Sequence, residues 1–157
     1  MNIISNLIEA HIFRESKGGI EFLLLKRSGD QIYPGVWQMV SGKIRESASG
    51  EEKAFETAIR EMKEESNLSP QKIWVAPRVN SFYTAITDTL CFVPVFAVKV
   101  DAGSEVKLSE EHDEFRWVNP AVAKKLLAWD GQRKAVEIIT EYFLNEQSFL
   151  NFVEIKL

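Results

Sequence analysis

The chain has few of the residues on which several protein classes depend. It contains a single cysteine, Cys91, among 157 residues, so a disulfide framework within the chain is excluded. No segment approaches the run of about 18 apolar residues that a membrane-spanning helix needs. Residues 1–10 also lack the basic stretch and following apolar run of a secretory signal. We therefore expect a cytoplasmic protein with no membrane partner.

Positive charge is also scarce, because 19 Lys and Arg face 23 Asp and Glu and the net charge is −4. Non-specific nucleic-acid binding depends on a basic surface, so a polynucleotide partner is disfavoured, whereas a small anionic substrate held through a metal ion is not. The two histidines, His11 and His112, form no nucleophile or metal constellation and are expected to be structural or exposed. Length and 45% apolar content suit one domain over residues 1–157.

The order of the expected elements is strands, a helix, more strands and two further helices. β-branched and aromatic residues predict strands at 3–14, 20–26, 36–40, 72–79, 81–83, 90–100 and 115–118. Helical spacing and end signals predict helices at 51–66, 119–128 and 132–144. Residues 43–50 are expected to form a polar loop, and 147–157 fit no single assignment. This order predicts an α+β fold, a mixed α/β/α sandwich.

Three carboxylates lie close together on the first expected helix. With Glu61 as the zero direction, Glu65 lies about 40° to one side of it and Glu64 about 60° to the other. Oxygen ligands grouped in this way suit a hard divalent cation. Glu65 falls inside the edge of the apolar stripe, so its charge needs compensation by a metal ion, Arg60 or Lys63. A solvated acidic face is the alternative, because like charges four residues apart cost only about 0.2–0.5 kcal/mol.

The residues around this cluster extend the pattern. Gly42, Glu52, the run Arg60–Glu65 and Leu68 resemble the Nudix box of the MutT-type hydrolases, Gly-x5-Glu-x7-Arg-Glu-apolar-x-Glu-Glu-x-Gly-apolar. Between Gly42 and Glu52 this chain has about four more residues than the pattern, and Asn67 replaces the closing glycine, where Asn tolerates a left-handed backbone. The resemblance implies the Nudix fold, a mixed sheet with a catalytic loop–helix–loop.

Members of this family hydrolyse a nucleoside diphosphate linked to another group by water attack on phosphorus, using Mg²⁺ or Mn²⁺. The resemblance implies that the metal ligands are the helix carboxylates, with a backbone carbonyl of the preceding strand; these are Glu61, Glu64, Glu65 and either Ser41 or Gly42.

Further roles follow from the same resemblance. Arg60 is the structural partner of Glu52, although an ordinary surface pair with Glu56 or Glu64 is the alternative. Relatives often add a downstream acid as metal ligand or general base, and Glu111 is the best placed, unless it belongs to a solvated acidic loop.

Three other segments, 36–42, 111–118 and 129–133, look like those of the nucleoside and dihydroneopterin triphosphate pyrophosphatases of the family. These segments serve only to choose among the branches of the family. Separately, Lys43 and Arg133 are candidates for contact with a substrate phosphate, and Trp37 and Tyr83 are candidates for stacking on a base or pterin. The structural alternatives are exposed basic side chains and aromatics that belong to the core.

The leading hypothesis is therefore a Mg²⁺-dependent pyrophosphohydrolase for a nucleoside triphosphate or a triphosphate-bearing pterin. Dinucleoside polyphosphates, nucleotide sugars and ADP-ribose remain open as substrates. The chain could instead be a Nudix-fold module that senses a nucleotide without cleaving it, although its three ligand positions are intact. An isomerase of the isopentenyl diphosphate type would need a reactive cysteine, and Cys91 lies in an apolar run. We expect a monomer or homodimer.

Overall fold

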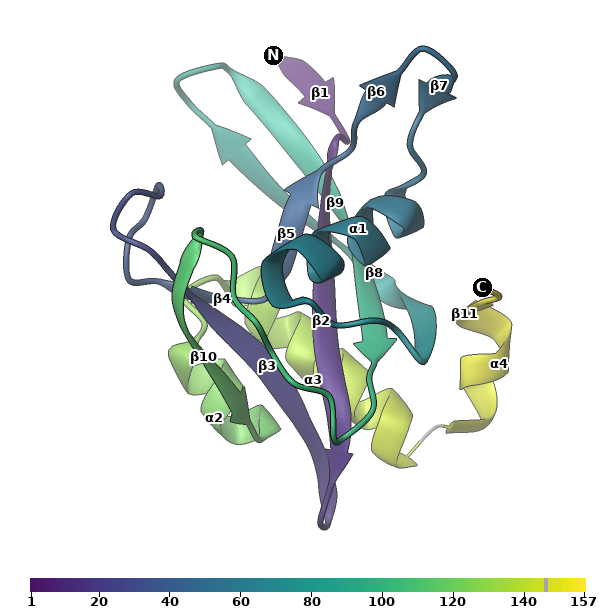
Figure 1. Ribbon diagram of the computed structural model, residues 1–157. Helices are drawn as coiled ribbons and strands as arrows, with labels where there is room; N and C mark the ends of the chain where they lie inside the picture. Colours follow the sequence, from purple (N-terminus) through teal and green to yellow (C-terminus); the bar gives the residue numbers. More distant parts are fainter. Residues whose placement is uncertain (146) are drawn as a thin grey trace.

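A computed structural model describes residues 1–145 and 147–157 and places one mixed sheet between helices on both faces (Figure 1). The strands of this sheet are β1 (Asn2–Ile4), β2 (Leu7–Ser16), β3 (Gly19–Arg27), β4 (Trp37–Gln38), β5 (Val40–Lys43), β8 (Lys72–Thr84), β9 (Thr89–Lys99), β10 (His112–Val118) and β11 (Glu154–Ile155). The helices are α1 (Ala54–Ser66), α2 (Pro120–Leu126), α3 (Asp130–Asn145), the 3-10 turn η1 (Gln147–Phe149) and α4 (Leu150–Val153). The predicted α+β architecture is the one observed.

The sheet has the strand order β10-β3-β2-β9-β8-β11. β2 and β9 are parallel at its centre, and β1 also runs parallel to β9, whereas the other pairs are antiparallel. β4 pairs with β3 and β5 pairs with β2, which brings β5 alongside α1. None of the described helices is long and apolar enough to cross a membrane.

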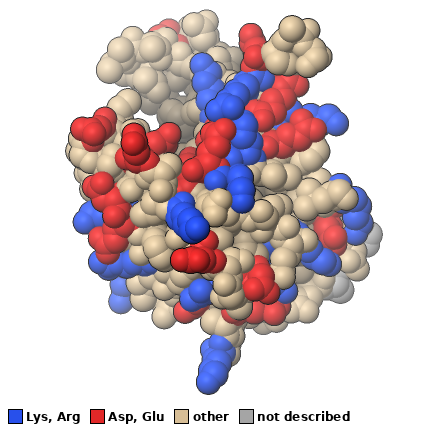
Figure 2. All heavy atoms as spheres, in the orientation of Figure 1, with Lys and Arg blue, Asp and Glu red and all other residues tan. Residues whose placement is uncertain are grey.

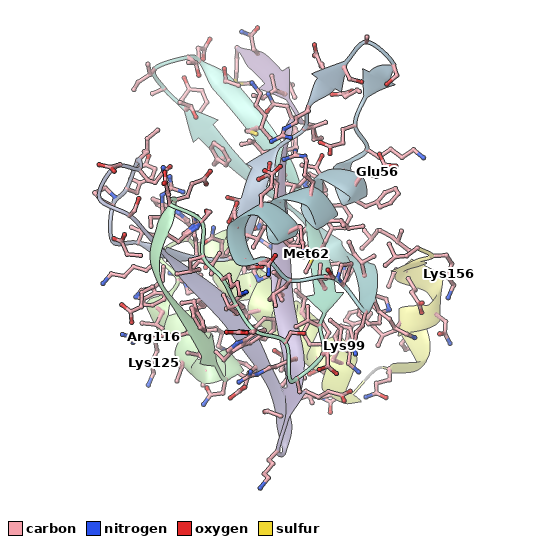
Figure 3. The ribbon with its side chains drawn as sticks, in the orientation of Figure 1. Glu56, Met62, Lys99, Arg116, Lys125 and Lys156 are labelled. Atoms are coloured by element: carbon pink, nitrogen blue, oxygen red, sulfur yellow. The ribbon has the colours of Figure 1, made fainter. Side chains whose placement is uncertain are left out.

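Alternate residues of β2 point to opposite faces of the sheet and supply two cores. Ile8 and Ile12 pack with Met62 of α1, and Figure 3 shows Met62 between α1 and the sheet. Phe13 packs on the other face with Ile139 of α3. The first core fixes α1 against the strands, and α1 carries the carboxylates predicted to bind metal.

The ends of α1 follow from local backbone chemistry. The helix begins at Ala54, three residues later than predicted, because Lys53 has an extended backbone and its N–H donates to the Glu56 carboxylate at 3.1 Å. It ends at Asn67, which adopts a left-handed conformation with φ of 61° and donates its N–H to the Lys63 carbonyl at 3.0 Å. The prediction that Asn67 would serve as a left-handed C-cap is confirmed.

Several predicted boundaries change where long-range pairing decides them. The strand expected at 3–14 divides into β1 and β2. The strand expected at 36–40 is interrupted at Met39, because β4 before this residue pairs with β3 and β5 after it pairs with β2. The loop at 43–50 is not plain coil, because it forms a hairpin of β6 (Glu46–Ser47) and β7 (Gly50–Glu51). The unassigned tail returns to the sheet, where β11 pairs with β8.

Replacing Asn67 with alanine should lower the free energy of unfolding by about 1 kcal/mol, since a Cβ without a local hydrogen-bonding side chain disfavours the left-handed conformation. Asn67→Gly should leave stability equal or slightly higher. Urea unfolding of the three proteins tests this, and equal stability of the alanine and glycine variants would contradict the role of the backbone conformation.

Candidate metal centre

The Glu65 side chain is buried, which is unusual for a carboxylate. It is 3% exposed, and its Oε2 atom has no hydrogen-bond partner among the described residues. Burial raises the pKa of Glu65 well above its usual range, and the negative charges of Glu111 and Glu61 raise it further. Arg27 and the backbone amide of Ser41 act in the opposite direction. The placement of Glu65 at the edge of the buried stripe agrees with the helical wheel.

Glu61 lies against the backbone of β5 at Gly42. A Cβ built on Gly42 would overlap the Glu61 side chain, so only a glycine at this position lets the carboxylate approach the strand so closely. The Glu61 side chain is 14% exposed. Burial raises its pKa, and the contact with Arg60 partly offsets that effect. The structure thus places the Glu61 and Glu65 side chains beside the backbone of β5.

The Arg60 guanidinium joins three parts of this region. Its Nε and Nη2 atoms donate to the two oxygens of Glu52, both at 2.9 Å, and Nη2 also donates to the Lys43 carbonyl at 3.0 Å. Nη1 contacts Glu61 Oε1 at 2.6 Å and Glu64 Oε2 at 3.3 Å. Hydrogen bonds from Arg60 are the main reason that the pKa of Glu52 falls to about 2. Arg60 therefore ties the loop, β5 and α1 to one another.

The third carboxylate, Glu64, is held from outside by the β6–β7 hairpin. Arg45, just before β6, places its Nη2 atom 3.2 and 3.3 Å from the two Glu64 oxygens. The Arg45 backbone exchanges hydrogen bonds with Glu52, whose N–H donates to the Arg45 carbonyl at 2.9 Å and whose Oε2 accepts from the Arg45 N–H at 3.3 Å. Figure 2 shows acidic and basic side chains interleaved over this region. The sequence indicated the enlarged loop but not the contact of Arg45.

The donor set fits a hard divalent cation. Three carboxylates leave α1 on the same side, the strand backbone adjoins one of them, and the buried Glu65 Oε2 atom has no hydrogen-bond partner among the described residues. Oxygen ligands of this kind suit Mg²⁺ or Mn²⁺. Over residues 1–145 and 147–157 no three His, Cys, Asp or Glu side chains are grouped so that they could hold a metal ion together, and the two more exposed carboxylates, Glu61 and Glu64, are instead paired with Arg60 and Arg45.

The sequence matches the family model of the NUDIX domain over residues 9–138. The chain belongs to the Nudix family. It is 32% identical over 108 residues to a bis(5'-nucleosyl)-tetraphosphatase (asymmetrical) of Caenorhabditis elegans, a match that covers 68% of this chain and 72% of that protein. It is 31% identical over 119 residues, or 75% of its length, to an octanoyltransferase of Myxococcus xanthus. The chain spans only about a third, 32%, of that second relative.

A solved structure shows the same Nudix fold. The crystal structure of a C. elegans Ap4A hydrolase binary complex superimposes with a TM-score of 0.74 at 22% identity, covering 89% of this chain and 97% of that one. The predicted family and fold class are therefore confirmed.

The loop before β10 lies near Glu65 and is joined to the end of β3 by a backbone hydrogen bond. The Ser28 N–H donates to the Glu111 carbonyl at 2.9 Å, and the exposed Glu111 lies close enough for its charge to raise the pKa of Glu65. The next residue, His112, is buried, and its Nδ1 atom lies 3.9 Å from Glu65 Oε2. Burial, together with the nearby Arg27, lowers the pKa of His112 to about 4, so this histidine is neutral at pH 7.

The predicted substrate-binding residues are more scattered. Lys43 is exposed at the end of β5, and its backbone carbonyl accepts a hydrogen bond from Arg60. Trp37 is half-buried, and the Arg116 guanidinium lies over its ring, 4.7 Å from the centroid. Trp37 therefore already stacks with a cation.

The polar groups of Tyr83 and Arg133 make hydrogen bonds outside the cluster of Glu61, Glu64 and Glu65. The Tyr83 hydroxyl, at the far end of the β8–β9 hairpin, donates to Asp88 at 2.9 Å. Arg133 donates from Nη1 to the carbonyls of Leu127 and Ala128, at 3.0 and 2.7 Å, and so holds the turn between α2 and α3. Substrate contact by these residues stays a prediction.

The Glu52–Arg60 pair makes folding stability depend on pH. Because the folded-state pKa of Glu52 is about 2 and the ordinary value is 4.5, its contribution is fully present above pH 4.5 and is lost as the pH falls toward 2. With allowance for partial exposure, Glu52→Gln should lower the free energy of unfolding by about 2 kcal/mol at pH 7.

Chemical unfolding of Glu52→Gln and wild type at pH 7 and at successively lower pH values measures this difference. We expect it to shrink below pH 4.5. A difference that is the same at every pH would show that the charge of Glu52 is not its cause.

Proposed function

We propose that the protein is a metal-dependent Nudix pyrophosphohydrolase that cleaves a phosphoanhydride bond of a nucleoside polyphosphate by water attack on phosphorus. The observation that carries this proposal is the buried Glu65 carboxylate, whose Oε2 atom has no partner among the described residues. A carboxylate in such a place costs several kcal/mol unless a cation joins it or it is protonated. Membership of the Nudix family supports a divalent metal as that cation.

In this proposal Glu61, Glu64 and Glu65 hold Mg²⁺ or Mn²⁺, with the backbone carbonyl of Ser41 or Gly42 as a further ligand. When bound, the metal neutralises phosphate charge and lowers the pKa of the attacking water. The side chains differ in exposure, since Glu65 is buried whereas the Glu64 side chain is 46% exposed. In this proposal Glu65 is the inner ligand, and Glu64 is the ligand that faces substrate.

The other residues position the reacting groups. Arg60 holds the loop and β5 against α1 through Glu52 and the Lys43 carbonyl. We assign to Glu111 the role of general base, which accepts the proton of the attacking water. Its carboxylate is exposed and lies near Glu65, and it is not one of the three carboxylates of α1 that hold the metal in this proposal. In this proposal Lys43, which is exposed at the end of β5, binds a substrate phosphate.

The candidate substrates share a chain of phosphates. A bis(5'-nucleosyl) tetraphosphate comes first because of the similarity to the C. elegans tetraphosphatase, and nucleoside or dihydroneopterin triphosphates come next because of the flanking segments. Nucleotide sugars and ADP-ribose complete the panel. We further propose a cytoplasmic location; whether the chain is a monomer or a homodimer stays a prediction.

Two other functions have less support. A sensing module without catalysis would not need three carboxylates around Gly42, yet all three are present. An isomerase of the isopentenyl diphosphate type would need a reactive thiol, but Cys91 is 2% exposed and its burial raises the pKa of the thiol.

Glu65→Gln and Glu64→Gln should each reduce hydrolysis of the best substrate by about 100-fold or more, since loss of a metal ligand exceeds the 10- to 100-fold effect of losing a residue that supports one. The matched control is Glu56→Gln on the same helix, because glutamine also fits the capping position that Glu56 occupies. The measurement is the turnover of the substrate panel at saturating Mg²⁺, with products identified in ¹⁸O-labelled water.

Full activity in both ligand variants would sink the assignment. Tight nucleotide binding by the wild-type protein without turnover of any panel member would favour the sensing module instead.

A further inference from the structure

A line of polar side chains leads from the half-buried Arg27 of β3 through two buried residues to the buried Glu65. Arg27 donates from Nη1 to Gln38 Oε1 at 3.1 Å, and Gln38 Nε2 lies 2.9 Å from His112 Nε2. His112 Nδ1 in turn faces Glu65 Oε2 at 3.9 Å. The side chains of His112 and Glu65 are 1% and 4% exposed. The line crosses from β3 through β4 and β10 to α1, so it joins elements that are distant in the sequence.

The chemistry of these groups fixes the position of one proton. A guanidinium has only donors, so Gln38 must turn its carbonyl oxygen toward Arg27 and its amide nitrogen toward His112. The amide nitrogen is also only a donor, and His112 Nε2 must therefore be an unprotonated acceptor. A neutral imidazole carries its proton on the other nitrogen, which places an N–H on Nδ1.

The atom nearest to that N–H among the acceptors of Glu65 is Oε2, at 3.9 Å from Nδ1, a separation slightly longer than a hydrogen bond. His112 Nδ1 and Glu65 Oε2 are both buried, and neither has a hydrogen-bond partner in the part of the chain that the structure describes. With the opposite tautomer, two lone pairs would face each other across 3.9 Å in a buried site, an arrangement that costs free energy.

We propose that His112 is a positioning residue, whose Nδ1–H orients the Glu65 carboxylate as a metal ligand, and that Arg27 and Gln38 set the tautomer required for this. The inference rests on the proposed function, because it assigns Glu65 to the metal site. Partners of this kind are known to tune metal ligands, and their loss costs about 10- to 100-fold in metal affinity or activity.

The first test needs neither metal nor substrate. The chain has two histidines, so ¹⁵N spectra of the imidazole rings of the metal-free protein contain two sets of signals, which a His11→Asn variant assigns. We expect His112 to be protonated at Nδ1 and unprotonated at Nε2. Gln38→Leu removes the donor to Nε2 and should raise the population of the Nε2–H tautomer. A wild-type His112 protonated at Nε2 overturns the proposal.

The second test measures Mn²⁺ affinity by electron paramagnetic resonance. His112→Leu, which cannot donate, should bind Mn²⁺ about 10- to 100-fold more weakly than wild type. His112→Asn, whose amide can place a donor near the Nδ1 position, should recover part of this loss. The matched control is His11→Leu, since His11 is also buried, at 1% exposure, but lies on the α3 side of the sheet.

Loss of thermal stability is expected in both leucine variants, and only the variant at His112 should lose metal affinity. Wild-type affinity in His112→Leu, or an equal loss in His11→Leu, contradicts the proposal. If His112→Leu does not fold, His112→Asn and the spectra of the wild-type protein decide the question. Failure of the wild-type protein to bind Mn²⁺ would overturn the proposed function instead, and the tautomer measurement would stand apart from it.

Discussion

The burial of the Glu65 carboxylate is the constraint on which the rest of the site depends. α1 packs on the sheet through Ala58 and Met62, which are fully buried, and the period of the helix takes Glu65 into the same interface. A negative charge there is unfavourable unless a positive charge or a proton accompanies it. Binding of a cation beside Glu65 would therefore relieve an unfavourable burial at the edge of the core. This burial, rather than the number of acidic residues on α1, distinguishes the site from an ordinary acidic helix face.

The arginines of the site occupy different depths. Arg60 lies half-buried in the loop–helix–loop and satisfies Glu52, Glu61 and the Lys43 carbonyl, so it maintains the geometry whether or not Glu64 is engaged. Arg45 reaches the exposed Glu64 from the β6–β7 hairpin. Arg27 lies on β3 and donates a hydrogen bond to Gln38. Arg60 and Arg45 therefore pair with Glu61 and Glu64, whereas the inner oxygen of Glu65 has no hydrogen-bond partner among the described residues.

The sequence was sufficient for the parts of this arrangement that depend on local periodicity. The apolar spacing of α1 predicted that Glu65 would be buried, and Asn67 predicted the left-handed residue at the end of the helix. The spacing from Glu52 to Arg60 indicated the family, and the comparisons confirmed it. These features are encoded within about 20 residues, over which the helical period is a dependable guide.

Other parts depend on pairing between distant segments, which periodicity does not encode. The division of the early strand follows from the parallel pairing of β1 with β9. His112 was expected to be structural or exposed, and only the meeting of β3, β4, β10 and α1 places it between Gln38 and Glu65. The residues of the enlarged loop gave no indication that Arg45 would reach Glu64.

The most direct test of the central claim is the pKa of the Glu65 carboxyl group, followed by ¹³C NMR with and without Mg²⁺. In the metal-free protein we expect a pKa well above the usual range for glutamate, because burial and the charges of Glu111 and Glu61 all oppose ionisation. Saturation with Mg²⁺ should lower that pKa strongly, since a bound cation favours the ionised form. An ordinary pKa that Mg²⁺ leaves unchanged would contradict the account of Glu65 as a buried metal ligand.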